Sequence, residues 1–308
     1  MLKRKVLGAL LVLALLMSFA GLTAEAAVRV DTEQKGSLQL TYSYDGQPFE
    51  GIEISIYRVA EISDVAAFTL TGSFYGLPVN VNDIKTQDEW KELASTLSGY
   101  VVAGEIAADY TLLTGDDGTV HFTELPLGLY LVGTVRAEQE DGYCHFDSFM
   151  ISVPTLDEDD NWLYDVIAKP KSFHKVIVPD EISYTVNKLW KDEGHQHLRP
   201  QSVSIDLYRD GEFVETVVLS EENNWTYTWI TIDDGAIWQA VETNVPEGYT
   251  VTLEQTGNYF FVTNSYDTET PPPDTGDIAN PQLYLLMMCA AGLGLILLGV
   301  AGKRSKKA

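Results

Sequence analysis

The sequence predicts an all-β protein made of two tandem antiparallel β-sandwich domains, the first of which carries a helical insertion. Short runs that alternate between apolar and polar residues recur along the chain, for example SLQLTYSY, IEISIYRV and VSIDLYR. Turn dipeptides such as Asp117-Gly118 and Asp210-Gly211 separate these runs. Alternation is typical of strands with one buried face, and Asp-Gly is typical of the hairpin turns that join them.

Residues 1–26 are expected to be a secretory signal peptide. Residues 3–5 are basic, residues 6–20 are almost entirely apolar, and Ala24-Glu25-Ala26 provides small residues for a cleavage site. Because the apolar run is short, export with cleavage is favoured over a membrane anchor.

Residues 28–172 and 180–267 are expected to form the two domains, and each is long enough to bury its own core. The boundary is placed near residues 171–180, where Pro179 follows a strand. In the first domain, Thr86-Gln-Asp-Glu89 matches a helix capping box. The apolar residues that follow it at helical spacing are Trp90, Leu93, Ala94 and Leu97. This helix is expected to be an insertion that packs on the sheet.

The C-terminal end of the chain is expected to anchor the precursor in a membrane. Residues 283–301 are 19 residues without a charge, about 28 Å as a helix, which is enough to cross the bilayer core. The basic tail at residues 302–308 should stay in the cytoplasm. Residues 268–276 contain three consecutive prolines and are predicted to be an extended, exposed linker.

Residues 27–275, which remain when both ends are removed, contain 13 Lys and Arg against 43 Asp and Glu, a charge of −30. This charge argues against nucleic acid and anionic membranes as partners, and it is also what a soluble, self-repelling surface would carry. Cys144 is the only cysteine of this region, so an intramolecular disulfide is excluded. We expect Cys144 to be a packed thiol, with His145 on the opposite face of its strand.

Three polar side chains fall at positions that strand alternation assigns to the buried face of the second domain: Lys188, Glu242 and Asn264. Their neighbours on the same faces are Tyr184, Val186 and Trp190 for the lysine, Trp238 and Ala240 for the glutamate, and Phe260 and Val262 for the asparagine. One such position could be an error of register. An amine, a carboxyl and a carboxamide together indicate a constellation on the first, a middle and the last strand.

Burial would make these three groups able to react with one another. Desolvation lowers the pKa of Lys188 and raises the pKa of Glu242, which favours a neutral amine and a protonated carboxyl. The amine is then a nucleophile, and the carboxyl can donate to the side-chain carbonyl of Asn264. Attack would expel ammonia and leave an amide between Lys188 and Asn264. The alternative is a buried Lys188–Glu242 ion pair beside a hydrogen-bonded Asn264.

Several motifs of the second domain form a known pattern: Val186-Asn-Lys-Leu-Trp190, Arg199-Pro200, Leu207-Tyr-Arg-Asp-Gly211, Asn224-Trp225, Val245-Pro-Glu-Gly-Tyr249 and Thr263-Asn-Ser-Tyr266. By these motifs, residues 181–267 closely resemble a Cna protein B-type domain of Gram-positive surface proteins, which has an Ig-like sandwich fold. The resemblance implies that Lys188, Asn264 and Glu242 are the intramolecular isopeptide triad of that family, without substitution.

The C-terminal pentapeptide, apolar span and basic tail resemble the sorting signal of Gram-positive surface proteins, which sortase reads. Pro273, Asp274, Thr275 and Gly276 match the family pattern Leu-Pro-x-Thr-Gly, and Pro272 replaces its leucine. The resemblance implies cleavage after Thr275 and transfer of its carbonyl to an amine. Sortase, other pilin subunits and peptidoglycan are therefore the expected partners.

The first domain resembles the N-terminal region of pilins more loosely, through residues 122–130 and 149–154. Thr41-Tyr42 and Thr134 stand where the isopeptide lysine and glutamate of that region would be, so no cross-link is expected in this domain.

The end of the first domain, Trp162-Leu-Tyr-Asp-Val-Ile-Ala-Lys-Pro-Lys171, resembles the pilin motif Trp-x3-Val-x-Val-Tyr-Pro-Lys. The resemblance implies that Lys171 is the amine that joins the next subunit, with Lys169 as a possible substitute. The alternative is a strand that ends in exposed lysines.

No metal site and no cofactor are expected. His195 and His197 lie in a loop without a third ligand, and residues 157–161 lack the glycine and distal glutamate of a calcium loop. No nucleophile–base pair for a turnover enzyme stands out in the exported region.

The sequence therefore predicts a pilin subunit, exported, assembled by sortase and attached to the cell wall. The alternative is a singly anchored adhesin, or an accessory pilin, that binds a host or surface ligand.

Overall fold

The computed structural model describes residues 29–140 and 142–266, and in this part the chain is built mainly of β-strands with one α-helix. The all-β prediction is confirmed. The predicted signal peptide, the linker with its sorting motif, the apolar span at residues 283–301 and the basic tail lie outside the described residues. Within the described ranges, no helix is long and apolar enough to cross a membrane.

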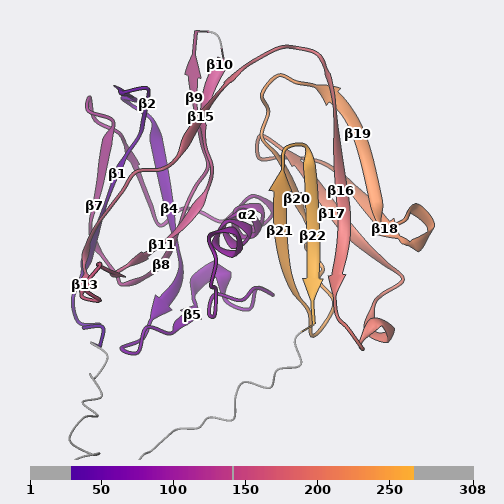
Figure 1. Ribbon diagram of the computed structural model, residues 1–308, viewed down its shortest axis with the longest axis horizontal. Helices are drawn as coiled ribbons and strands as arrows, with labels where there is room; N and C mark the ends of the chain where they lie inside the picture. Colours follow the sequence, from indigo (N-terminus) through magenta and orange to yellow (C-terminus); the bar gives the residue numbers. More distant parts are fainter. Residues whose placement is uncertain (1–28, 141, 267–308) are drawn as a thin grey trace, which may run out of the picture. The chain divides into compact units, whose positions relative to one another are not determined.

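The strands fall into two groups that pair only among themselves, and we call them the N-terminal module (β1–β15) and the C-terminal module (β16–β22) (Figure 1). The strands of the N-terminal module are β1 (Gly36–Thr41), β2 (Ser43–Tyr44), β3 (Gln47–Pro48), β4 (Glu53–Ile62), β5 (Phe68–Leu70), β6 (Tyr110–Leu113), β7 (Thr119–Leu125), β8 (Gly128–Val132), β9 (Val135–Gln139), β10 (Gly142–Phe146), β11 (Phe149–Val153), β12 (Thr155–Leu156), β13 (Trp162–Leu163), β14 (Asp165–Ala168) and β15 (Ser172–Val176). Those of the C-terminal module are β16 (Glu181–Lys191), β17 (Ser202–Arg209), β18 (Glu212–Ser220), β19 (Thr226–Ile232), β20 (Trp238–Val241), β21 (Thr250–Thr256) and β22 (Tyr259–Ser265).

In the N-terminal module, the order β11-β8-β4-β5 forms the largest sheet, with β6 pairing on β4, and β14-β1-β7 forms a second sheet. Their apolar faces enclose a core that contains Leu38, Ile54, Phe122 and Cys144. β15 pairs with β10, so the strand pairing of this module extends to Val176, within the boundary region near residues 171–180 that the sequence suggested.

The C-terminal module consists of two sheets, β19-β16-β22-β21 and β18-β17-β20. The Asp210-Gly211 turn between β17 and β18 has positive φ at both residues, 50° and 85°, as the predicted hairpin requires. β16 and β22 are neighbours and run parallel, with Lys188 opposite Val262 and Trp190 opposite Asn264. The first and last strands of the module therefore lie side by side.

The helix α2 (Gln87–Ala103) begins at the predicted capping box. The Thr86 hydroxyl accepts from the Glu89 backbone N–H at 3.1 Å, and the Glu89 carboxylate accepts from the Thr86 backbone N–H at 2.9 Å. Leu93, Ala94 and Leu97 are buried, as the helical spacing predicts.

The helix contacts both modules, which the sequence did not suggest. It packs on β8 and β11 of the N-terminal module and on β20 and β21 of the C-terminal module. β21 is at the edge of its sheet, and its backbone N–H groups find acceptors in the N-terminal module: Val251 donates to the Pro78 carbonyl at 2.8 Å and Leu253 to the Thr96 hydroxyl at 2.7 Å. An exposed sheet edge is thereby paired.

Replacing Thr86 by alanine removes the capping hydroxyl at the start of α2. We expect Thr86→Ala to lower the free energy of unfolding by about 1 kcal/mol, because the Glu89 N–H loses its acceptor. Thr86→Ser keeps an oxygen at this position and should stay close to the wild type. Urea unfolding followed by circular dichroism measures both, and equal stability of Thr86→Ala and Thr86→Ser would contradict the role of the cap.

Candidate functional site: a buried lysine, glutamate and asparagine

The sandwich of the C-terminal module brings Lys188, Glu242 and Asn264 together. Lys188 lies on β16 and Asn264 on the adjacent β22, and strand alternation turns both side chains inward. Glu242 belongs to the opposite sheet, where it follows Val241, the last residue of β20. The three strand faces that the sequence predicted to be buried are buried.

All three residues are closed off from solvent. Their relative exposure is 4% for Lys188, 2% for Glu242 and 0% for Asn264. The ring of Trp190 lies beside the amine, with Nζ 4.4 Å from the ring centroid. Charged side chains are rarely buried without partners. The contacts of this cluster therefore decide whether Lys188 and Glu242 are charged or neutral.

The amine of Lys188 has two backbone acceptors and one acidic neighbour. Nζ donates to the Leu189 carbonyl at 3.0 Å and to the Val262 carbonyl at 3.2 Å. It lies 3.5 Å from Oε2 of Glu242, which is an ion-pair distance and too long for a good hydrogen bond. A neutral amine has two N–H groups, and the two carbonyls can hold both of them while the lone pair stays free.

Glu242 also contacts the carboxamide of Asn264. Nδ2 of Asn264 donates to Oε1 of Glu242 at 2.9 Å. Oδ1 of Asn264 and Oε2 of Glu242 are buried and have no hydrogen-bond partner among the described residues. A proton on the carboxyl would turn Glu242 into a donor as well as an acceptor, which would relieve part of this deficit.

Burial shifts both titrating groups toward their neutral forms. Desolvation lowers the pKa of Lys188 to about 8, although the Glu242 carboxylate opposes the shift. Desolvation also raises the pKa of Glu242, and here the lysine opposes it. Both shifts favour the state in which the one proton that the pair shares lies on the Glu242 carboxyl and the Lys188 amine is neutral.

A second polar cluster, which the sequence analysis did not identify, lies beside the first. The buried carboxylate of Asp192 accepts from Arg199, Nε at 2.8 Å and Nη2 at 2.6 Å, and from the Tyr249 hydroxyl at 2.9 Å. The hydrogen bonds from Arg199 hold the pKa of Asp192 below its usual range. The Trp190 ring contacts Tyr249 and lies 5.5 Å from the Arg199 guanidinium, so this cluster fixes the wall that faces Lys188.

The sequence analysis also missed Tyr100 of α2, whose hydroxyl donates to the backbone carbonyl of Glu242 at 3.0 Å. Its spacing from Leu93 and Leu97 marks it as part of the buried helix face. Nothing in the sequence indicates which residue it contacts.

The other residues singled out in the sequence lie apart from this cluster. Lys169 and Lys171 are exposed, in the connection between β14 and β15. Cys144 is buried in the N-terminal core, and desolvation raises the pKa of its thiol. Pro272, Pro273, Asp274, Thr275 and Gly276 are outside the described residues.

Neither candidate metal segment gathers ligands. His195 stacks on Tyr266, with ring centroids 4.8 Å apart. The Asp157 carboxylate accepts from the backbone N–H groups of Asp159 and Asn161. Over residues 29–140 and 142–266, no group of three or more His, Cys, Asp or Glu side chains is placed to hold a metal ion.

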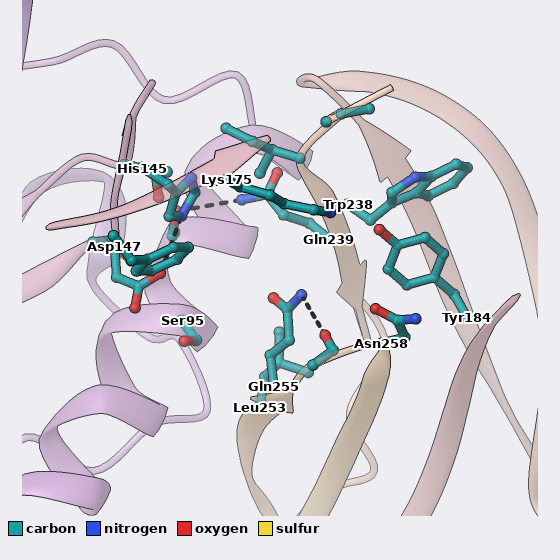
Figure 2. Close-up of a pocket in the computed structure, with 18 of the residues that line it drawn as sticks. Ser95, His145, Asp147, Lys175, Tyr184, Trp238, Gln239, Leu253, Gln255 and Asn258 are labelled. Carbon is teal, nitrogen blue, oxygen red and sulfur yellow. Dashed lines mark hydrogen bonds and ion pairs between the residues drawn. The ribbon is translucent and has the colours of Figure 1, made fainter. Parts of the chain in front are cut away.

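A cleft of about 330 Å³ is lined by residues of both modules. Figure 2 shows Lys175 of β15, Tyr184 of β16 and Gln239 of β20 facing it. Lys175 is paired with Asp233 at 2.8 Å, and His145, which also lines the cleft, lies 3.0 Å from Asp147. The lining also contains further aromatic rings and amides, namely Tyr143, Phe173, Trp238, Gln255 and Asn258.

Comparison with known proteins identifies the C-terminal module. Residues 184–265 match the family model of the Cna protein B-type domain, which confirms the resemblance found in the sequence. The chain is 41% identical over 101 residues to the collagen adhesin of Staphylococcus aureus. That match covers 30% of this chain and 8% of the adhesin, so the chain corresponds to a small part of that protein.

Solved structures of low identity are also similar to this chain. A single B repeat unit of the collagen-binding surface protein of S. aureus is 19% identical, with 76% of this chain and 98% of that chain covered at a TM-score of 0.27. The shaft pilin SpaA of Lactobacillus rhamnosus GG is 16% identical; the match covers 77% of this chain and 100% of that chain, with a TM-score of 0.28. The major pilin SpaD of Corynebacterium diphtheriae is 14% identical; the match covers 78% of this chain and 67% of that chain, with a TM-score of 0.29.

Proposed function

We propose that this chain, which carries a Cna protein B-type domain at residues 184–265, is a structural protein of the Gram-positive cell surface and not a turnover enzyme. Its C-terminal module is closed by an amide bond between Lys188 and Asn264. The observation that carries the proposal is the solvent-free cluster in which the Lys188 amine, the Glu242 carboxyl and the Asn264 carboxamide meet.

The reaction needs the neutral amine and the protonated carboxyl. The lone pair of Nζ attacks Cγ of Asn264, and the C–Nδ2 bond breaks. Glu242 donates its proton to the carboxamide and takes one from the attacking nitrogen, so that Nδ2 leaves as ammonia and the carboxyl is regenerated. If the carboxamide rotates by half a turn, Oδ1 faces Oε1 of Glu242, where a protonated carboxyl can polarise it. A buried charge is replaced by a neutral amide, which removes a desolvation cost.

The bond would resist pulling along the chain. β16 and β22 run parallel, so tension between residues 181 and 266 loads this strand pair in shear. A covalent link from Lys188 to Asn264 carries that tension directly from one strand to the other. Residues 189–263, which contain the rest of the sandwich, are then outside the load.

We further propose that sortase joins the Thr275 carbonyl of one chain to Lys171 of the next, and finally to peptidoglycan, which makes the chain a pilin subunit of the cell wall. The exposure of Lys171 supports a role as acceptor, because a bulky enzyme intermediate must reach the amine. Lys188, at 4% exposure, is not accessible to such an intermediate.

The second candidate function is a singly anchored adhesin, or an accessory pilin at the tip or base. The cleft lined by Tyr184, Gln239 and Asn258 favours it, because aromatic rings with convergent polar groups are typical of ligand sites. The partial identity to a protein named collagen adhesin also supports a host or surface ligand.

The amide bond can be detected as a change in mass. The mature chain should weigh one ammonia less than its sequence, and Glu242→Ala should restore the full mass because the proton carrier is lost. Glu254→Ala, an exposed carboxylate of the same module, should leave the loss intact. Intact-protein mass spectrometry measures the mass of the wild type and of both variants. A wild-type mass equal to the plain sequence would rule out the bond.

The rate of ammonia loss should depend on pH in a bell shape. Above a pH of about 8, the Lys188–Glu242 pair gives up its shared proton and no acid remains, so the rate should fall roughly tenfold per pH unit. In acid, a second proton binds and the amine becomes an ammonium, so the rate should fall again. Chain recovered unreacted from inclusion bodies, with the full mass of its sequence in denaturant, is refolded at different pH values and sampled by mass over time. A rate that keeps rising with pH would show that the carboxylic acid is not needed.

Polymerisation separates the pilin from the singly anchored adhesin. Wall extracts should contain a ladder of covalent multimers that disappears with Lys171→Ala, whereas the matched change Lys169→Ala, at another exposed lysine, should leave it. Immunoblots of denatured extracts read the ladder. Survival of the ladder in Lys171→Ala would move the acceptor to Lys169 or Lys175, and a wild type that stays monomeric beside its sortase would favour the adhesin.

A further inference from the structure

A residue of the N-terminal module reaches the backbone of Glu242. The Tyr100 hydroxyl on α2 donates to the Glu242 carbonyl at 3.0 Å, and both groups are buried. Tyr100 and Glu242 are 142 positions apart in the sequence. The carbonyl that accepts this hydrogen bond belongs to the same residue as the carboxyl that carries the proton.

Glu242 needs such an anchor because of where it lies. The pairing of β17 with β20 ends at Asp206 and Val241, so Glu242 is the first residue beyond the ladder. After it the chain enters the connection to β21, at Thr250. A residue just past a strand end is held less firmly than one inside the sheet, yet the Glu242 carboxyl must stay within reach of both Lys188 and Asn264.

The helix also fits closely against the strand that leads into Glu242. A Cβ atom placed on Gly99 would lie 2.9 Å from Cγ2 of Val241, closer than real Cβ contacts allow. Gly99 therefore lets α2 approach β20 at the residue before Glu242. Gln239 of the same strand donates to the Ser98 hydroxyl at 3.3 Å. Successive residues of α2 thus contact the end of β20.

We propose that Tyr100 is a positioning residue for amide formation: by holding the Glu242 carbonyl, it aims the carboxyl at Lys188 and Asn264, so that the bond forms at full rate only when α2 is docked. The proposal rests on the amide-forming function proposed above. Tyr100 touches none of the reacting atoms and acts through the backbone of Glu242. The covalent closing of the C-terminal module is in this way coupled to the folding of the N-terminal module.

Tyr100→Phe tests the role of the hydroxyl while it keeps the buried ring. The matched control is Tyr130→Phe, which removes another buried tyrosine bond to a backbone carbonyl, that of Pro126, within the N-terminal module. The full chain is recovered unreacted from inclusion bodies, with the full mass of its sequence in denaturant, then refolded in detergent while its mass is followed over time. We expect Tyr100→Phe to lose ammonia about fivefold more slowly than the wild type, the effect of one neutral hydrogen bond. The final yield should be unchanged, because all three reacting groups remain.

If Tyr100→Phe acted only by lowering stability, Tyr130→Phe would slow the reaction in the same way. The positioning role instead predicts that Tyr130→Phe reacts at the wild-type rate. Equal rates for Tyr100→Phe and the wild type, or equal slowing of both tyrosine variants, would overturn the positioning role. Gly99→Ala provides a second variant, since the added methyl must shift α2 or the Val241 side chain, and it too should slow the reaction without changing the yield. If the wild type never loses ammonia, the proposed amide itself is wrong. That outcome differs from a Tyr100→Phe variant that loses ammonia at the wild-type rate, which would contradict only the positioning role.

Discussion

The structure of the C-terminal module depends on one constraint, which is that an amine, a carboxyl and a carboxamide share a space without water. An unpaired polar group in such a place costs free energy, and an unpaired charge costs more. The parallel pairing of β16 with β22 brings Lys188 and Asn264 to one sheet, and the end of β20 brings Glu242 from the other. Among the described residues, two acceptors of the cluster still lack donors. This incomplete hydrogen bonding supports the reaction proposed above.

The helix α2 connects that constraint to the rest of the chain. The C-terminal sandwich leaves β20 and β21 at the edges of its two sheets, and α2 contacts both. Open edges invite pairing with other chains, and here the Thr96 hydroxyl and the Pro78 carbonyl accept the free N–H groups of β21. Buried apolar residues of α2, such as Leu97, belong to one continuous core with Val241 and Leu253. The contacts that close the sandwich edge are therefore the same contacts that bring Tyr100 to Glu242.

Strand alternation was enough to predict the burial of Lys188, Glu242 and Asn264, because side chains two positions apart share a face and their neighbours are apolar. The capping box likewise predicted the start of α2. The contact between Tyr100 and Glu242 was beyond such rules, since a tyrosine on a buried helix face looks the same whichever partner it meets. β15 lies within the boundary region that was placed near residues 171–180, and its pairing with β10 is a long-range contact that no local pattern carries.

The proposed bonds also determine which parts of the protein would carry force in a polymer. Tension that enters at Lys171 runs through β15 and β16 to Lys188, crosses to Asn264, and leaves toward Thr275. Residues 189–263 lie outside this path, and they include β20 and β21, on which α2 docks. The N-terminal module before Lys171 lies outside it as well. The hydrogen bond between Tyr100 and Glu242 therefore lies off this path, whereas the ion pair between Lys175 of β15 and Asp233 lies on it. A docking contact that lies off the load path could position Glu242 while the proposed amide forms, and the amide would then carry the tension.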